Sequence, residues 1–288
     1  MTFQAAEQSL TTLLEGLYEK REAATITGMV MESVTGLSKM ERLLSKNEIL
    51  SDIHLERLKQ YTNELSTGKP VQYVIGEAWF AGLCLHVTPD TLIPRPETEE
   101  LVNWCAQWAT ANIKSSEPLK ILEVGTGSGC IAIALQKKLP SAQITAIDIS
   151  AAAIEVATAN AAAQCAAIRF LTIDFLNEAS WTGLDRYDII ISNPPYIAEI
   201  EKNNMANHIL DFEPHTALFV PDNNALVFYN AIENFGNKNL QPGGAIFVEI
   251  NQALGFETQD VFAQKKYTTV LKKDLFGNDR MIFATKTN

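Results

Sequence analysis

The residues best placed to do chemistry form a short polar turn directly after an apolar run. Asn193, Pro194, Pro195 and Tyr196 follow residues 187–192, a β-branched run typical of a buried parallel strand. Each proline fixes its φ angle and lacks an N–H donor, so the chain must leave the strand in a rigid turn. Two acceptors, the Asn193 amide oxygen and the Pro194 carbonyl, then lie beside the ring of Tyr196. The turn can therefore hold the N–H groups of a bound molecule, although an ordinary strand-ending turn has the same composition.

A glycine-rich turn follows an earlier apolar run at residues 121–124. Glycines at such a strand-to-helix turn permit positive φ and let a ligand approach the backbone without meeting a Cβ atom. The nicotinamide fingerprint is not matched, because Cys130 occupies its third glycine position, and no lysine is present for a triphosphate. A simple flexible turn is the competing interpretation. If a ligand binds, we expect a nucleoside with an uncharged or cationic tail, held by Glu123, Gly125, Thr126, Gly127, Ser128 and Gly129.

Three further residues follow the next two apolar runs. Asp148 is placed to accept hydrogen bonds from ribose hydroxyls, and its alternative role as a helix cap is already met by Ser150. Asp174 is placed to accept from an exocyclic amine, and Phe175 to stack on a base. Burial in the core is the competing interpretation for Phe175, as for any apolar aromatic residue.

Strand and helix patterns alternate from Lys120 onward, which predicts a doubly wound, Rossmann-like α/β fold with a parallel sheet. Ligands bind such sheets at the carboxyl ends of the strands, where the four polar turns would meet. The predicted strands are 121–124, 144–147, 168–172, 188–192, 245–250, 267–271 and 281–284. The predicted helices of this part are 130–138, 151–163, 224–235 and 253–264.

The chain before this sheet divides into two parts. Residues 1–75 carry apolar residues at helical spacing and predict a small helical bundle that serves recognition of a partner. Residues 71–87 mix aromatics with glycines and predict a β-hairpin, within a connector at 76–97 that precedes the main domain at 98–288. In that connector two prolines hold Arg95 extended, and we expect it to pair with the acidic run that follows.

Composition sets the broad class. With 47% hydrophobic and 20% charged residues, the chain is ordinary globular material. Its net charge of −11 argues against a general polyanion-binding surface. The four cysteines and four histidines show no metal-ligand spacing, so we expect no metal. No leader sequence and no membrane-length apolar run is visible, which predicts a soluble cytoplasmic protein.

The glycine turn, the downstream aspartate and the Asn-Pro-Pro-Tyr turn together resemble the class I S-adenosylmethionine-dependent methyltransferases. The whole chain is similar to the release factor glutamine methyltransferases among them. The further resemblance lies in Pro70-Val71-Gln72-Tyr73, in residues 92–99 and in Phe212-Glu213-Pro214, and it covers about residues 68–285. Relatives often carry Trp at the position of Phe175, which is a departure here.

The resemblance implies S-adenosyl-L-methionine as cofactor and transfer of its methyl group to the side-chain amide nitrogen of a glutamine, in the Gly-Gly-Gln motif of a release factor. Asn193 and Pro194 would accept the N–H groups of that amide, with Pro195 and Tyr196 beside it, and Glu249 is a weaker candidate for the site. A ribosomal protein substrate, an adenine in nucleic acid, and a non-catalytic S-adenosylmethionine-binding adaptor remain alternatives. We expect a monomer with no stable nucleic-acid partner.

Overall fold

The structure is a computed structural model that describes residues 1–113, 117–205 and 207–286. The chain divides into two compact units. The first comprises Met1–Glu77 and helix α9 (Asn207–Phe212), and the second comprises the rest of the described chain. Within the described ranges, no helix is both long and apolar enough to cross a membrane.

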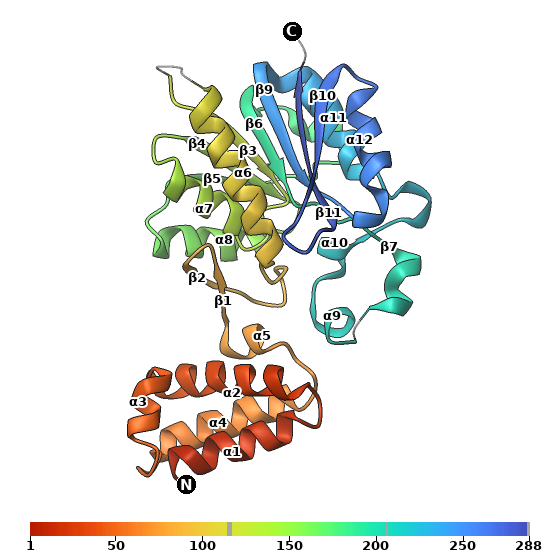
Figure 1. Cartoon of the computed structure of the whole chain (residues 1–288). Helices are drawn as coiled ribbons and strands as arrows, with labels where there is room; N and C mark the ends of the chain where they lie inside the picture. The colour runs from red at the N-terminus through yellow and green to blue at the C-terminus, as the bar shows by residue number, and fades with distance from the viewer. Residues whose placement is uncertain (114–116, 206, 287–288) are drawn as a thin grey trace. The chain divides into compact units, whose positions relative to one another are not determined.

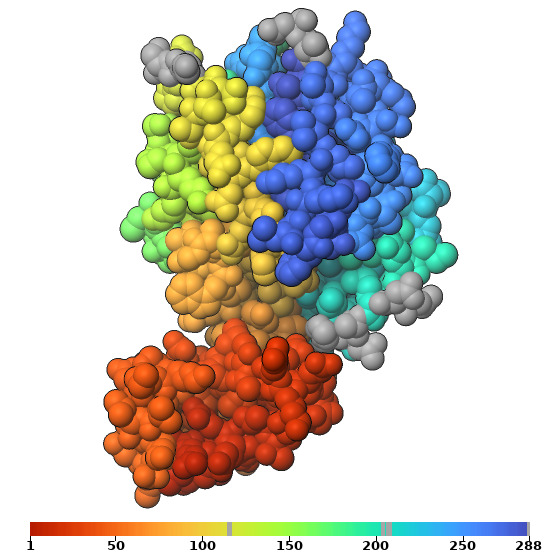
Figure 2. Space-filling model, viewed as in Figure 1, coloured from red at the N-terminus to blue at the C-terminus, as the bar shows by residue number. Residues whose placement is uncertain are grey.

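The first unit is helical, as predicted for residues 1–75, and these residues form one compact body, coloured red to orange in Figure 2. Its helices, apart from α9, are α1 (Phe3–Leu14), α2 (Lys20–Thr35), α3 (Lys39–Leu44), α4 (Asp52–Leu65) and α5 (Val71–Ile75). Side-chain caps start three of them, from Thr2, Ser38 and Ser51. The apolar faces of α1, α2, α4 and α5 meet in a core that includes Leu14 and Met31, both fully buried. The core lies within the unit itself, so the unit has its own source of stability.

The second unit is built on a seven-stranded sheet with the order β10-β11-β9-β6-β3-β4-β5. Its strands are β3 (Lys120–Val124), β4 (Gln143–Asp148), β5 (Ile168–Thr172), β6 (Tyr187–Ser192), β9 (Leu240–Glu249), β10 (Tyr267–Lys273) and β11 (Asp279–Lys286). The seven predicted strands are confirmed, but the sheet is not wholly parallel: β11 runs antiparallel to both neighbours. The reason is local, because β10 and β11 are joined by the short loop 274–278, and so short a connection joins antiparallel strands.

Helices cover both faces of this sheet (Figure 1). One face carries α6 (Pro96–Asn112), α7 (Cys130–Lys138) and α8 (Ala151–Ala163), and the other carries α11 (Val227–Asn239) and α12 (Gly255–Ala263). Two apolar cores lie between the sheet and these helices, with residues of β3 and β6 alternating between them. This double cover explains why the strands read as continuous apolar runs.

The register of the sheet brings the polar turns together. Val124 at the end of β3 pairs with Ser192 at the end of β6, and Ser192 pairs in turn with Val248 of β9. The chain order reverses between β3 and β6, which is where open α/β sheets bind ligands. The glycine turn and Asn193 therefore leave the sheet side by side.

The connecting segments differ most from the sequence-based expectations. The hairpin is confirmed, as β1 (Glu77–Phe80) and β2 (Leu83–His86), with positive φ at Ala81 and Gly82 as its tight turn requires. The expected strand character at 71–75 is wrong, because Pro70 starts one helical turn there and Gly76 ends it at φ 78°.

No element was predicted between 198 and 223, and the structure has several short ones in that stretch. Strand β7 (Ile197–Ala198) pairs with β8 (Phe219–Val220), and α10 (His215–Leu218) lies just before β8. Short 3₁₀ segments complete the second unit: η1 (Glu178–Trp181), η2 (Glu199–Asn204), η3 (Asp222–Asn224) and η4 (Gln252–Leu254). Elements of two to six residues are too short for a period to be visible in the sequence.

Candidate active site

The glycine turn after β3 has three residues with positive φ, at 76° for Gly125, 52° for Gly127 and 82° for Gly129. The three glycines differ in the atoms that a Cβ atom, if added to each of them, would contact. At Gly129 it would lie 3.1 Å from Cβ of Ala157, so this glycine lets α7 and α8 pack closely. At Gly127 it would meet nothing within 4 Å, and at Gly125 only the Asn193 carbonyl oxygen at 4.0 Å. Gly125 and Gly127 therefore keep open a space above the backbone that a ligand can enter.

Glu123 holds this turn from below. Its Oε2 accepts hydrogen bonds from the Thr126 hydroxyl at 2.7 Å and from the Ala132 backbone N–H at 3.1 Å, tying β3 to the turn and to α7. Burial raises the pKa of the Glu123 carboxyl from 4.5 to about 8. Its second oxygen and the buried Ser128 hydroxyl have no hydrogen-bond partner among the described residues.

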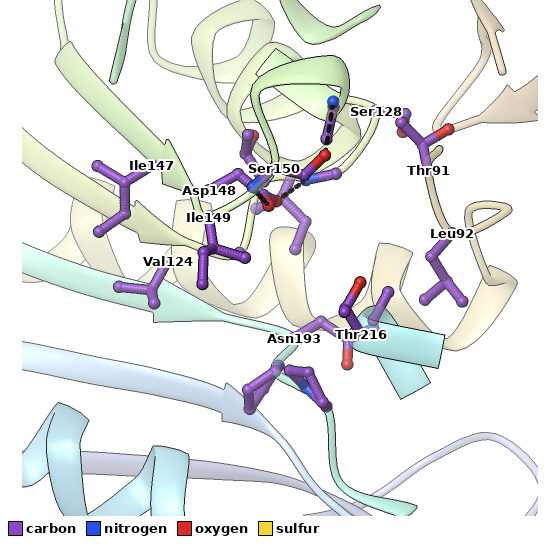
Figure 3. Close-up of a pocket in the computed structure, with 18 of the residues that line it drawn as sticks. Thr91, Leu92, Val124, Ser128, Ile147, Asp148, Ile149, Ser150, Asn193 and Thr216 are labelled. Carbon is purple, nitrogen blue, oxygen red and sulfur yellow. Dashed lines mark hydrogen bonds between the residues drawn. The ribbon is translucent and has the colours of Figure 1, made fainter. Parts of the chain in front are cut away.

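Asp148 ends β4 with its carboxylate held at two points. Oδ2 accepts from the Gly127 N–H and Oδ1 from the Ser150 N–H, both at 2.9 Å (Figure 3). The Ser150 hydroxyl caps α8 by accepting from the Ala153 N–H, so the expectation that Ser150 and not Asp148 caps this helix is confirmed. A carboxylate oxygen accepts more than one hydrogen bond, so both oxygens can still take a donor from the cavity.

After β5, Asp174 lines the cavity while its Oδ1 accepts from the Leu176 N–H at 3.0 Å. Phe175 lines the cavity as well, but only 4% of it is exposed. Its ring packs against Trp181 and Phe235, at centroid distances of 5.4 and 5.5 Å. Burial of Phe175 in the core is therefore confirmed, and its stacking on a base stays a prediction.

Exposed apolar side chains beside these aspartates were missed from the sequence. Ile149 and Leu176 are 60% and 42% exposed, and both line the cavity. Each directly follows a residue that we had selected, Asp148 or Phe175, and an apolar residue in a polar strand-end turn was the available signal. Such side chains can cover the faces of a flat ring.

Asn193, Pro194 and Pro195 line the same cavity. The Asn193 amide donates from Nδ2 to the Thr98 hydroxyl at 3.1 Å, and Thr98 donates to Oε2 of Glu249 at 2.6 Å. Thr98 was not singled out from the sequence, because nothing local marks it as a partner of a residue 95 positions away. The Asn193 amide is therefore not a simple strand cap.

Tyr196 is hydrogen-bonded to a carboxylate at the end of β9. Its hydroxyl donates to Oε1 of Glu249 at 3.3 Å, and it is not among the described residues that line the cavity. Burial, with the Glu249 charge, raises the pKa of this hydroxyl well above its ordinary value. The ring packs against the core of the second unit, and its contact with a ligand stays a prediction.

Arg95 does form an ion pair, but the expected partner was wrong. Its guanidinium contacts Glu213 at 2.6 Å, 118 positions away, and Glu213 is buried. The nearby carboxylates have other partners: Glu99 accepts from the Ala81 N–H and Glu100 from the Leu275 N–H. Arg95 also lines the cavity, so this pair places the segment that precedes α6 against its wall.

The cavity has about 1050 Å³ of empty space, including solvent at its open side, which suits a nucleoside-sized ligand. Its charged lining consists, among the described residues, of Asp90, Asp148, Asp174 and the paired Arg95. The chemistry fits S-adenosylmethionine: an open backbone at two glycines, a held carboxylate for ribose, an unpartnered buried hydroxyl at Ser128, and excess negative charge for a sulfonium and an ammonium.

Two family models match the sequence. The Methyltransferase small domain model matches residues 106–217, and the PrmC N-terminal domain model matches residues 7–76. Among solved structures, a methyltransferase from Pyrococcus furiosus has a TM-score of 0.51 at 18% identity, covering 72% of this chain and 91% of that one. The catalytic domain of hMettl16, in complex with MAT2A 3'UTR hairpin 6, has a TM-score of 0.55 at 15% identity, covering 82% of each chain. At these identities the likeness shows the fold alone.

Curated relatives are similar over nearly the whole chain. The release factor glutamine methyltransferase of Flavobacterium psychrophilum is 41% identical over 270 residues, 93% of this chain and 94% of the relative. That of Bacteroides thetaiotaomicron is 37% identical over 274 residues, 95% of this chain and 96% of the relative. With such identity across almost the full length of both proteins, the chain belongs to the release factor glutamine methyltransferase family.

Proposed function

We propose that this chain transfers a methyl group from S-adenosylmethionine to the side-chain amide nitrogen of a glutamine in a peptide chain release factor, within its Gly-Gly-Gln motif. The family gives the reaction. The observation in the structure that supports it best is the bonding of Asn193, whose NH₂ group is engaged by Thr98. Its amide oxygen is thus left as an acceptor at the wall of the cavity.

The cofactor is held by the strand-end turns. Gly125 and Gly127 let it lie close to the backbone, and Asp148 takes the ribose hydroxyls. Asp174 accepts from the base amine, while Ile149 and Leu176, with the edge of Phe175, cover the base. Glu123, Thr126, Ser128 and Gly129 shape this turn. When bound, S-adenosylmethionine supplies an electrophilic methyl group on a sulfonium.

The target amide is a poor nucleophile, because its nitrogen lone pair is delocalised into the carbonyl. The chain therefore contributes positioning and electrostatics. Oδ1 of Asn193 and the carbonyl of Pro194 each accept one N–H of the target, which directs the nitrogen and favours the positive charge that it gains. Pro194 and Pro195 keep these acceptors on a stiff backbone. Tyr196 supports the exit of the turn through its bond to Glu249.

A general base is not needed before attack, because an N-methylated amide cation loses its proton readily. The lining of the cavity agrees with this, since within the described chain it contains no histidine and no lysine. Proton loss to water after transfer suffices.

Three alternatives differ in the acceptor or in the reaction. A glutamine of a ribosomal protein would fit the same turn, whereas an adenine in nucleic acid would need a basic face that a chain of net charge −11 does not favour. An adaptor that only binds the cofactor would have no use for the oriented Asn193. We further propose that the protein acts in the cytoplasm as a monomer, without a stable nucleic-acid partner.

The test is methyl transfer from labelled S-adenosylmethionine to three purified acceptors: a release factor, a ribosomal protein with an accessible glutamine, and DNA. We expect label in the release factor alone. A release factor whose target Gln is changed to Glu is the matched control, since the attacking nitrogen is gone. Equal labelling of this Gln→Glu protein, or preferred labelling of another acceptor, would refute the proposal.

A further inference from the structure

The side-chain amide of Asn193 can lie in two orientations of nearly the same shape. Rotation by 180° exchanges its acceptor, Oδ1, with its donor, the NH₂ group. Only one orientation suits a target amide, whose own N–H groups need acceptors. In the other orientation, the NH₂ group of Asn193 would face the NH₂ group of the target, and neither could accept a hydrogen bond. The groups around Asn193 therefore decide whether the turn can hold its target.

The orientation of the Asn193 amide is determined by the single hydroxyl hydrogen of Thr98. The Thr98 hydroxyl lies between Asn193 and Glu249 and is 2% exposed as a residue. At 2.6 Å from Oε2 of Glu249, its hydrogen is donated to the carboxylate, as the short distance of a charge-assisted bond indicates. Only lone pairs then remain on the Asn193 side. Asn193 therefore donates a hydrogen bond from its NH₂ group to the Thr98 hydroxyl oxygen, with 3.1 Å between Nδ2 and Oγ1.

Glu249 is in turn held as an acceptor. Its two oxygens take donors from different elements, Thr98 of α6 and Tyr196 of the turn after β6. An ionised carboxylate has no hydrogen to give, so it can only accept from both. Its backbone carbonyl accepts from the Tyr229 hydroxyl at 3.1 Å, which anchors the end of β9. Burial raises the pKa of this carboxyl, whereas the bond from Thr98 and the charge of Arg280 oppose that rise and favour the ionised form.

The sheet register explains why these three side chains meet. Ser192 pairs with Val248, so the residues that follow them, Asn193 just beyond β6 and Glu249 at the end of β9, lie at the same level. Thr98 reaches them from the first turn of α6, which begins at Pro96. The cluster thus rests on three rigid elements, as a group that orients another must.

We propose that Thr98 and Glu249 are positioning residues, which hold the Asn193 amide in the orientation that presents Oδ1 to the target nitrogen. This rests on the proposed glutamine methylation. Neither residue needs to touch the reacting atoms: Glu249 fixes the hydrogen of Thr98, and Thr98 fixes the amide of Asn193. The competing view is that Thr98 merely ties α6 to the sheet.

The central experiment compares Thr98→Val with Thr98→Ser in the full chain. Val removes the hydroxyl at nearly the same shape, whereas Ser keeps it. We expect Val to lower kcat about tenfold, the effect of losing one orienting hydrogen bond, with KM for the release factor and Kd for S-adenosylmethionine nearly unchanged. Ser should restore kcat to within about threefold of wild type. Thr110→Val, on the exposed side of the same helix, is the matched control and should leave kcat unchanged.

A double-variant cycle separates orientation from stability. In a chain that already carries Asn193→Ala, Thr98→Val has no amide left to orient and should lower kcat no further. A normal kcat in Thr98→Val, an equally low kcat in Thr98→Ser, or additive losses in the double variant would each overturn the proposal. Loss of folding would show as a lower Tm in Thr98→Val, and Glu249→Gln then serves as the second variant, with reduced kcat expected. If wild type fails to methylate the release factor, the proposed function fails instead.

Discussion

At the scale of single residues, substitutions of Asn193 distinguish a role in methyl transfer from a role in ending the strand. Asn193→Ala removes an acceptor prearranged for the transition state, and we expect kcat to fall by ~10²–10³. Asn193→Asp keeps an acceptor but cannot donate to Thr98 and adds a charge, so it should also be clearly impaired. Calorimetry should show S-adenosylmethionine affinity changed little in both. Near-normal turnover in Asn193→Ala would mean that the residue only ends a strand.

Asp148 has the corresponding role for the cofactor. Asp148→Ala should weaken S-adenosylmethionine binding by about 1–3 kcal/mol, because a charged hydrogen-bond partner of the ribose is lost. The turn also loses the bonds from Gly127 and Ser150, so Asp148→Asn, which keeps an acceptor oxygen, is the control and should lose less. Titration calorimetry measures both. Unchanged affinity in Asp148→Ala would contradict the ribose assignment.

Protonation of the Glu249 carboxyl leads to a prediction of how kcat depends on pH. Burial raises the pKa of its carboxyl, the bonds from Thr98 and Tyr196 and the charge of Arg280 lower it, and the charge of Glu97 raises it, with a net raised pKa. A protonated Glu249 can donate to Thr98, whose hydrogen is then free to turn the Asn193 amide the wrong way.

We therefore expect kcat to fall as the pH is lowered through a value above the ordinary glutamate pKa of 4.5. A pH profile of kcat, taken at saturating cofactor, measures this fall on the acidic side, which is the acidic limb of the profile. In Thr98→Val the limb should flatten, because the link from Glu249 to the amide is cut. The same limb in both proteins would show that another group titrates.

At the scale of elements, the turn between β3 and α7 depends on a buried carboxyl. The pKa of Glu123 is about 8 in the folded chain and ordinarily 4.5, so folding takes up a proton between these values. A raised pKa gives stability that is complete below pH 4.5 and is lost as the pH rises towards 8. Relative to Glu123→Gln, which does not titrate, the wild-type chain should lose free energy of unfolding across this window.

Denaturant unfolding at a series of pH values tests this. Tryptophan fluorescence is a suitable probe, because Trp79, Trp104, Trp108 and Trp181 all lie in the second unit. Glu155→Gln, at an exposed position of α8, is the control and should parallel the wild type. If the difference between wild type and Glu123→Gln were independent of pH, Glu123 would be ionised in the folded chain.

At the scale of the whole molecule, the helical unit has its own core, and none of its described residues belongs to the cavity lining. A shortened chain that begins at Ala78, where the second unit starts, should bind S-adenosylmethionine with affinity close to that of the full chain. Its turnover on a folded release factor should fall strongly, because we assign substrate recognition to residues 1–75. Full turnover by the shortened chain would refute that assignment, and a shortened peptide substrate with the Gly-Gly-Gln motif distinguishes lost recognition from lost chemistry.

The sequence by itself determined the architecture and the convergence of the polar turns. Strands buried on both faces need continuous apolar runs such as residues 187–192, and parallel strands place their carboxyl ends along one edge. Asn193, Asp148 and Gly127 could therefore be assigned to one site before any contact was known. The start of α8 at Ser150 was equally local, since a cap depends only on residues two or three positions away.

Only the tertiary structure decided the hydrogen-bond and ion-pair partners of the residues at the site. Arg95 has carboxylates at 97, 99 and 100, yet it pairs with Glu213. Of the nearer groups, Glu99 and Glu100 accept from backbone N–H groups of distant loops. Thr98 and Glu249, 151 positions apart, meet only because α6 crosses the ends of β6 and β9. Hydrogen bonds and ion pairs form over about 3 Å, whereas sequence periodicity reports only which face of an element is buried. The orientation of the Asn193 amide follows from such partners, and so it becomes visible only in the folded chain.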